Sequence, residues 1–201
     1  MSGPRLMLAS QSESRRRLLE QAAVPFELVE AGIDEDAVKG ALEAEGLSAR
    51  DLADALAEWK AQRPSIRHPG DFVLGCDQTL ELDDGSRVDK VATREEAAAL
   101  LERMSGRAHK LHSAAVIAQG GAAQWRHIES VTLHMRPLST AFIDRYLALD
   151  WEACRWCVGC YRVEGPGAQL FSRISGSLFA VQGLPLLPLL DYLRTRSILP
   201  A

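Results

Sequence analysis

Short apolar runs alternate along the chain with segments of helical periodicity, and few fold classes accommodate this alternation. Residues 71–76 and 110–118 are apolar runs of the length expected for buried strands. Residues 93–106 lie between them and form the clearest helical segment, which begins with a capping box made by Thr93 and Glu96. The alternation points to an α/β or a mixed α+β fold.

Other segments follow the same two periodicities. A first helix is expected directly after Ser12, with Leu18, Leu19 and Ala22 as its apolar stripe. Further strands are expected at 25–33 and 127–135, a hairpin at 80–88, and further helices at 34–46, 48–63, 139–149 and 184–194. No repeat or linker divides the sequence, so residues 1–201 are expected to form a single domain.

The charge balance excludes some classes of partner. The chain has a formal net charge of −4, which argues against a general affinity for nucleic acid polymers or anionic membranes. The densest apolar stretch, residues 178–190, is interrupted by polar and proline residues and is too short to span a bilayer. The first ten residues show no secretion signal, so a cytoplasmic location is expected.

Three consecutive arginines stand at an unusual place. Arg15, Arg16 and Arg17 fall at the start of the first expected helix, where the positive end of the helix dipole makes each unfavourable by a few tenths of a kcal/mol. A helix N-terminus also favours phosphate, and Ser10 and Ser12 add hydroxyl donors there. A phosphate site and a solvated basic face explain the arginines equally well.

Several other charged residues have both a functional and an ordinary interpretation. Asp77 comes directly after a buried strand, where α/β proteins place working groups, although turns also favour aspartate. The acidic residues 34–36 suit Mg²⁺ and also suit a helix start. Lys60 and Lys90 are either phosphate ligands or solvated charges. Glu164 precedes glycines that allow close approach of a ligand, but alone it is an ordinary loop carboxylate.

The cysteines raise the question of a metal centre. Cys154, Cys157 and Cys160 form a C-x-x-C-x-x-C pattern, whereas Cys76 lies in a strand-like run far away in the sequence. Three grouped ligands are one fewer than a structural zinc site needs. Because free cysteine is among the most buried residue types, packing is the favoured interpretation.

No common catalytic signature competes with these candidates. The sequence contains no P-loop, no dinucleotide-binding glycine motif, no H-E-x-x-H and no G-x-S-x-G. Its five histidines include no pair four residues apart on an expected helix. A mechanism that depends on histidine is therefore not supported.

A series of motifs occurs in order over nearly the whole chain. They are "LASQSESRRRLLE", Ile33-Asp34-Glu35, Lys60-Ala61, "LGCDQ", Lys90 before the capped helix, "MSGRAH", "VEGPGAQLFSRISG" and "GLPLLPLL". This series resembles the Maf family of nucleoside triphosphate pyrophosphatases. The resemblance implies an α/β fold with an elongated mixed sheet flanked by helices and two lobes around a central cleft, like the inosine triphosphatases. Members are often dimeric, so a homodimer and a monomer both stay open.

The resemblance also implies a reaction and its residues. A nucleoside triphosphate would be hydrolysed between the α and β phosphates to the monophosphate and pyrophosphate, with Mg²⁺ or Mn²⁺ as the cofactor. Carried over residue by residue, the motifs assign catalysis to Asp77, Lys60 and Lys90, substrate binding to Ser10, Ser12, Arg15, Arg16, Gln78 and Glu164, and the metal to Glu35 and Asp77.

Within the family, Asp77-Gln78 and Glu164 resemble the branch that hydrolyses 7-methyl-GTP. A carboxylate accepts hydrogen bonds from the guanine N1–H and amine, and a positively charged ring strengthens them. The alternatives are the dTTP/UTP branch and a nucleotide-binding regulator of cell division that has lost catalysis, for which Glu13 and Asp89 are unusual residues. A metal-binding structural protein built on the three cysteines is the third alternative.

Overall fold

The computed structural model describes residues 4–32 and 34–200, without the side chain of Asp36. Ile33 of the family motif therefore lies outside the described residues. The described strands are β1 (Leu6–Ala9), β2 (Glu27–Leu28), β3 (Phe72–Glu81), β4 (Arg87–Val88), β5 (Ala108–Gln119), β6 (Ala122–Met135) and β7 (Phe171–Ser175). The helices are α1 (Glu13–Gln21), α2 (Glu35–Ala44), α3 (Ala49–Arg67), α4 (Arg94–Met104), α5 (Thr140–Cys154), the 3₁₀ turn η1 (Pro166–Leu170), α6 (Leu178–Val181) and α7 (Leu186–Thr195).

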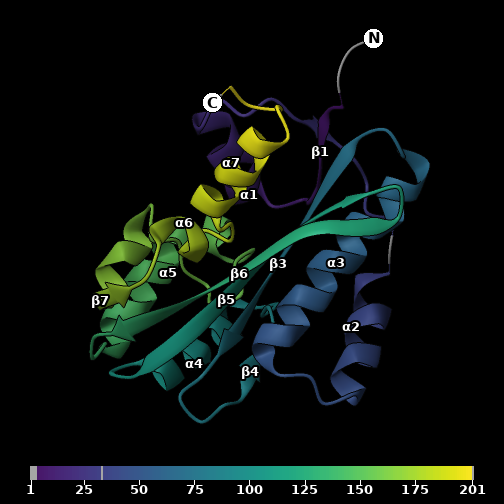
Figure 1. The fold of residues 1–201 in the computed structure, drawn as a ribbon. Helices are drawn as coiled ribbons and strands as arrows, with labels where there is room; N and C mark the ends of the chain where they lie inside the picture. Colours follow the sequence, from purple (N-terminus) through teal and green to yellow (C-terminus); the bar gives the residue numbers. More distant parts are fainter. Residues whose placement is uncertain (1–3, 33, 201) are drawn as a thin grey trace. The chain divides into compact units, whose positions relative to one another are not determined.

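The strands confirm a mixed α/β fold (Figure 1). Within the described residues they form a seven-stranded sheet in the order β2-β1-β3-β5-β6-β7, with β4 paired to β3. β1 is parallel to β2 and β3, whereas β4 is antiparallel to β3 and β7 is antiparallel to β6. The sheet is therefore mixed, as the family resemblance implied.

The chain divides into two compact units that interleave in sequence. The first unit comprises Met1–Gln78, Ser113–Glu129 and Gly183–Ala201, and the second comprises Thr79–His112 and Ser130–Gln182. No helix among the described residues is long and apolar enough to cross a membrane.

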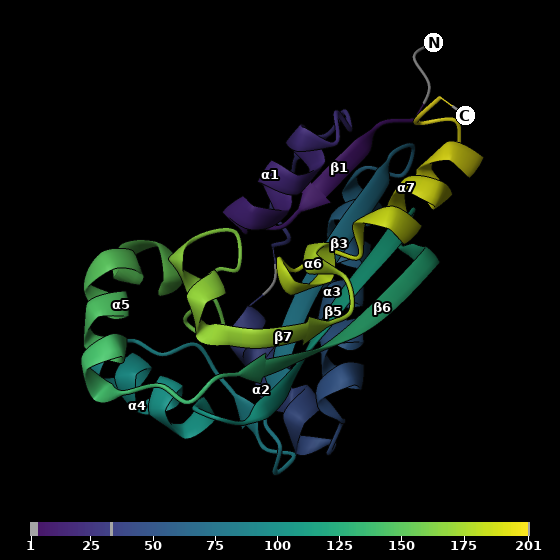
Figure 2. The ribbon, with the colours of Figure 1, turned by 90° about the vertical axis from the view of Figure 1, so that its left-hand side faces the viewer.

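In the first unit, α3 packs closely on the sheet. Its buried face carries alanines, and Gly75 of β3 lies so near that a Cβ atom there would be 2.2 Å from the carbonyl oxygen of Ala57. α2 lies beside α3 (Figure 1), and Figure 2 shows α1 alongside β1. Trp59, expected on the buried face, is 46% exposed, because the buried stripe instead runs through Leu56 and Lys60.

The second unit has its own apolar core. Side chains from β5, β6, α4 and α5 meet there, and α4 packs against α5. The capping box of α4 is present, with Thr93 and Glu96 bonding to each other's backbone as expected. The buried ring of His109 packs in a cluster with Tyr161 and Phe171.

Two expected boundaries were wrong. β3 does not end at Cys76 but continues to Glu81, so that it runs directly into the expected hairpin, where Leu80 and Glu81 pair with β4. Asp77 is therefore inside a strand rather than directly after one. The expected strand at 25–33 is reduced to the two residues of β2, which pair with Met7 and Leu8.

Candidate active site

The start of α1 turns one arginine into the protein. Ser12 caps the helix by accepting a hydrogen bond from the backbone N–H of Arg15. The Arg15 side chain is buried and donates from Nε to the carbonyl oxygen of Gly183 (2.8 Å) and from Nη1 to that of Cys76 (3.0 Å). Nη1 also donates to Ser10 Oγ (3.2 Å). Among the described residues, the two donors on Nη2 have no partner.

The neighbouring arginines point outward. Arg16 lies 3.7 Å from Glu20 and Arg17 pairs with Glu13, in both cases as exposed ion pairs one helical turn apart. Such pairs contribute little to stability. The charge of the unusual Glu13 is paired with that of Arg17. The helical spacing of Arg15 from Leu18 and Leu19 is the sequence signal that could have identified Arg15 as the inward-facing arginine.

A lysine lies between two carboxylates beside β3. Lys60 of α3 is buried, and its Nζ is 2.7 Å from Oδ1 of Asp77 and 2.9 Å from Oε2 of Glu35. Glu35 is the first residue of α2, whose N-cap is Asp34. The structure thus brings together three of the predicted site residues, from α2, α3 and β3.

Successive side chains of a strand point to opposite faces of its sheet. Asp77 and Gly75 face α3, so Gln78 faces the other way, where its Nε2 donates to Oγ of Ser113 on β5 (2.8 Å). Ser113 is fully buried and was not predicted as part of the site. Its sequence context, a small polar residue in an apolar run, gave no distinctive signal.

Arg15 and Lys60 reach the same point of β3 from different elements. β1 ends at Ala9, which pairs with Gly75, so β3 continues past the end of its parallel neighbour. There Arg15 binds the Cys76 carbonyl and Lys60 binds the side chain of Asp77, the next residue. Two cations converge on adjacent residues, an arrangement suited to an anionic ligand.

The carboxylate oxygens of Asp77 and Glu35 also suit a divalent cation as ligands. Mg²⁺ prefers oxygen ligands and is usually bound by one or two carboxylates together with substrate phosphates and water. Asp77 and Glu35 supply two carboxylates within reach of one ammonium group, which shows that a positive charge is accommodated between them. Within the described residues, no group of three or more acidic, histidine or cysteine side chains is placed to hold a metal.

Lys90 and Glu164 belong to the second unit and are both exposed. Cys157 lies within electrostatic reach of both, although burial is the main reason that its pKa is raised to about 12. Burial likewise raises the pKa of Cys160 to about 12. Together with the burial of Cys154, these raised values describe unreactive thiols rather than nucleophiles.

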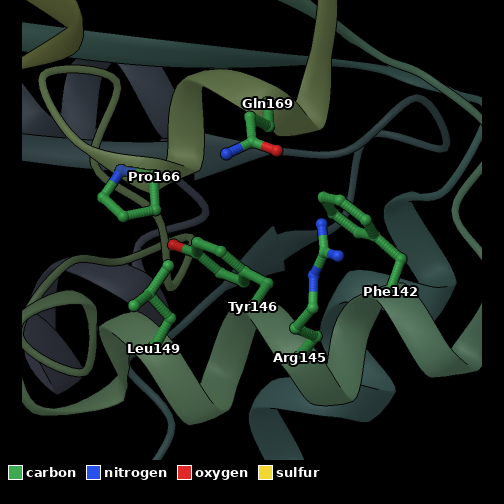
Figure 3. A pocket seen from close by; sticks show the side chains of 6 residues that line it. All are labelled: Phe142, Arg145, Tyr146, Leu149, Pro166 and Gln169. Carbon is green, nitrogen blue, oxygen red and sulfur yellow. The ribbon is translucent and has the colours of Figure 1, made fainter.

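The second unit also contains a small pocket that shares no lining residue with the predicted site. It is lined by side chains of α5 and η1, namely Phe142, Arg145, Tyr146, Leu149, Pro166 and Gln169 (Figure 3). Its volume of about 30 Å³ has room for one or two water molecules and not for a nucleotide base. None of the predicted site residues lines it.

Comparison with known proteins gives matches over nearly the full chain. Residues 5–196 match the family described as Maf-like protein. A protein of Sphingopyxis alaskensis named nucleoside triphosphate pyrophosphatase is 49% identical over 195 residues, covering 97% of this chain and 98% of its own length. A protein of the same name from Caulobacter vibrioides is 49% identical over 199 residues, with 99% of both chains covered. Among solved structures, a HAM1 protein from Coxiella burnetii matches with a TM-score of 0.43 and 16% identity over 66% of this chain and 73% of its own, too low to support a conclusion.

Proposed function

The chain belongs to the Maf family, and on that basis we propose that it is a nucleoside triphosphate pyrophosphatase. The reaction splits the bond between the α and β phosphates, with water supplying the new oxygen and pyrophosphate leaving. The observation that carries the proposal is the convergence of Arg15 and Lys60 on Cys76 and Asp77. Hydrolysis of this bond needs positive charge along the polyphosphate and a water held in line; Arg15 and Lys60 supply the charge, and the Asp77 carboxylate supplies an acceptor for the water.

Each group in the first unit has donors or acceptors left for substrate. Arg15 is fixed by three hydrogen bonds, and its free Nη2 edge is suited to a phosphate oxygen. Ser10 Oγ accepts from Arg15 and from the backbone N–H of Ser12, so its own hydrogen remains to donate. Lys60 has three N–H donors and uses two on Glu35 and Asp77.

Asp77 is the residue that we assign to the attacking water. Its carboxylate is fixed by Lys60 at 2.7 Å and keeps a second oxygen to orient the water or accept its proton. Glu35 and Asp77 would together hold Mg²⁺ or Mn²⁺, which when bound neutralises charge on the phosphates. No covalent intermediate is required.

We assign the remaining predicted residues to substrate contacts. Lys90 would contact the triphosphate, and Glu164 would accept hydrogen bonds from the base. The Glu164 carboxylate is exposed and makes no hydrogen bond or ion pair with the described residues, which supports 7-methyl-GTP as the preferred substrate, because a positively charged ring gains most from a carboxylate. Ser12 and Arg16 are assigned to the phosphate end by their place in the helix start, although Arg16 here points toward Glu20.

The test replaces Asp77. Asp77→Asn keeps the shape of the side chain but removes its charge, so it should lower kcat for pyrophosphate release at least about 100-fold with little change in melting temperature. Asp71→Asn is the matched control, since Asp71 precedes the same strand and is also ion-paired, to Arg5. Activity in Asp77→Asn equal to that of the control would refute the role of Asp77.

A further inference from the structure

Two buried hydrogen bonds hold the segment that carries Glu164 within the second unit. Tyr146 of α5 donates to the carbonyl oxygen of Cys160 (3.0 Å), and His109 Nε2 is 2.7 Å from the hydroxyl of Tyr161. Cys160 has a φ of +54°, which costs energy for a residue with a side chain. A strained backbone held by this many contacts is typical of a functional segment.

Glu164 itself takes no part in this network. It lies in a turn closed by a hydrogen bond from Gly165 N–H to the carbonyl oxygen of Arg162 (3.2 Å). In the described parts of the chain, its exposed carboxylate has no hydrogen bond or ion pair. A rigid segment therefore presents a carboxylate without a partner, which points to a ligand outside the chain.

A cation in the same turn could neutralise that carboxylate. The guanidinium of Arg162 packs against Gly165, where a Cβ atom would lie 3.3 Å from Nη2, and Glu164 is one of the charges that raise the pKa of Arg162. Asp150 competes for the same guanidinium. It is 4% exposed, accepts from both Nη2 and Nε of Arg162, and its hydrogen bond is the first cause of the raised pKa.

The Asp150 carboxylate is itself fixed in place. It lies on α5 one turn after Tyr146, whose hydroxyl is 3.4 Å from Oδ2. A bidentate pair between arginine and carboxylate is strongly directional, so Arg162 is held toward α5. Its ion pair is then made with Asp150, and among the described residues Arg162 makes none with Glu164.

We propose that Asp150 is a positioning residue for nucleotide selection: it keeps Arg162 from forming an ion pair with Glu164, so that Glu164 keeps its charge for a cationic ring such as 7-methylguanine. The inference rests on the base-reading role of Glu164 given under the proposed function. A neutral guanine still finds hydrogen-bond acceptors on a carboxylate that Arg162 neutralises. A cationic ring loses its electrostatic partner, so the preference for the methylated base is the quantity that Asp150 controls.

The test measures binding, so that it does not depend on catalysis. Affinities for 7-methyl-GMP and GMP are measured by calorimetry, and their ratio is compared among variants whose folding is checked by thermal melting. Wild type should prefer 7-methyl-GMP, and Glu164→Gln should remove the preference. Asp150→Asn should reduce it about tenfold by freeing Arg162 to pair with Glu164.

The double variant Asp150→Asn/Arg162→Gln separates charge control from a structural role. With Arg162 removed as a competing partner for Glu164, it should recover most of the wild-type preference, whereas loss of a structural clamp would make it at least as poor as Asp150→Asn. Glu152→Gln is the matched control, because it removes an exposed carboxylate of the same helix that pairs with Arg155. It should behave as wild type.

The outcomes distinguish the base-reading role of Glu164 from the positioning role of Asp150. Equal affinity of the wild type for both nucleotides overturns the base-reading role of Glu164 and this inference with it, whether or not the protein releases pyrophosphate. A preference that Glu164→Gln abolishes but Asp150→Asn leaves intact, or that the double variant fails to restore, overturns the inference alone.

Discussion

At the scale of single residues, burial separates three neighbours that look alike in sequence. The start of α1 could be predicted from Ser12, because the capping preference is local. The helical spacing from Leu18 and Leu19 could have marked Arg15 as the inward-facing arginine, but its partners could not be predicted, since they come from β3 and from the loop before α7. Only the fold brings those carbonyl groups to the helix start.

His109 leads to a prediction about acid stability. Burial first, and His134 second, lower the pKa of His109 from 6.5 to about 4. The unfolded chain takes up this proton as the pH falls below 6.5, whereas the folded protein resists until about 4. His109 therefore favours the folded state fully above 6.5, and this contribution is lost as the pH falls through that window.

The measurement is the free energy of unfolding by urea between pH 7 and pH 4. In the wild type, His109 should account for a decline of at most about 1.4 kcal/mol per pH unit. His109→Gln should be less stable at pH 7 but should show a shallower decline. Equal slopes for the two proteins would contradict the assigned pKa.

At the scale of elements, whether a segment forms a helix or a strand was easier to predict than where that helix or strand ends. The helices with clear capping residues and apolar periodicity formed as expected, among them α4 with its capping box. β3 was predicted too short because the polar Asp77 and Gln78 ended its apolar run. β3 lies beside β5, a pairing between distant parts of the sequence that local patterns do not carry, whereas its pairing with β4 belongs to the hairpin expected at 80–88.

The contact between α3 and β3 gives a prediction for the site. A Cβ atom on Gly75 would also lie 2.5 Å from the backbone nitrogen of Ala61, next to Lys60. Gly75→Ala should therefore push α3 from the sheet, lower stability by about 1–3 kcal/mol and reduce turnover by separating Lys60 from Asp77. Denaturant unfolding and pyrophosphate release measure the two effects.

Gly40→Ala is the control for that experiment. Gly40 lies inside α2 with nothing within 4 Å of the added carbon, so the variant should gain about 0.5–1 kcal/mol and keep its activity. Full activity and unchanged stability in Gly75→Ala would show that the spacing between α3 and β3 does not matter for the site.

At the scale of the whole molecule, the ordered motifs were the strongest signal. They predicted the family and the mixed sheet, which the family match and the strand pairing confirm. The two units could not be derived from composition, because each is assembled from separate stretches of sequence. The single domain over residues 1–201, the homodimer and the cytoplasmic location stay predictions, as do the roles of all the site residues, the divalent metal and the preferred base.

The central claim is tested most directly by pyrophosphate release from 7-methyl-GTP, GTP, UTP, dTTP and CTP, each with Mg²⁺ and with chelator. We expect release that depends on the metal, is strongest with 7-methyl-GTP and disappears in Asp77→Asn. Stronger release from dTTP or UTP would keep the reaction but contradict the assigned substrate. No release from any nucleotide, by folded protein that still binds one, would contradict the proposed enzymatic function.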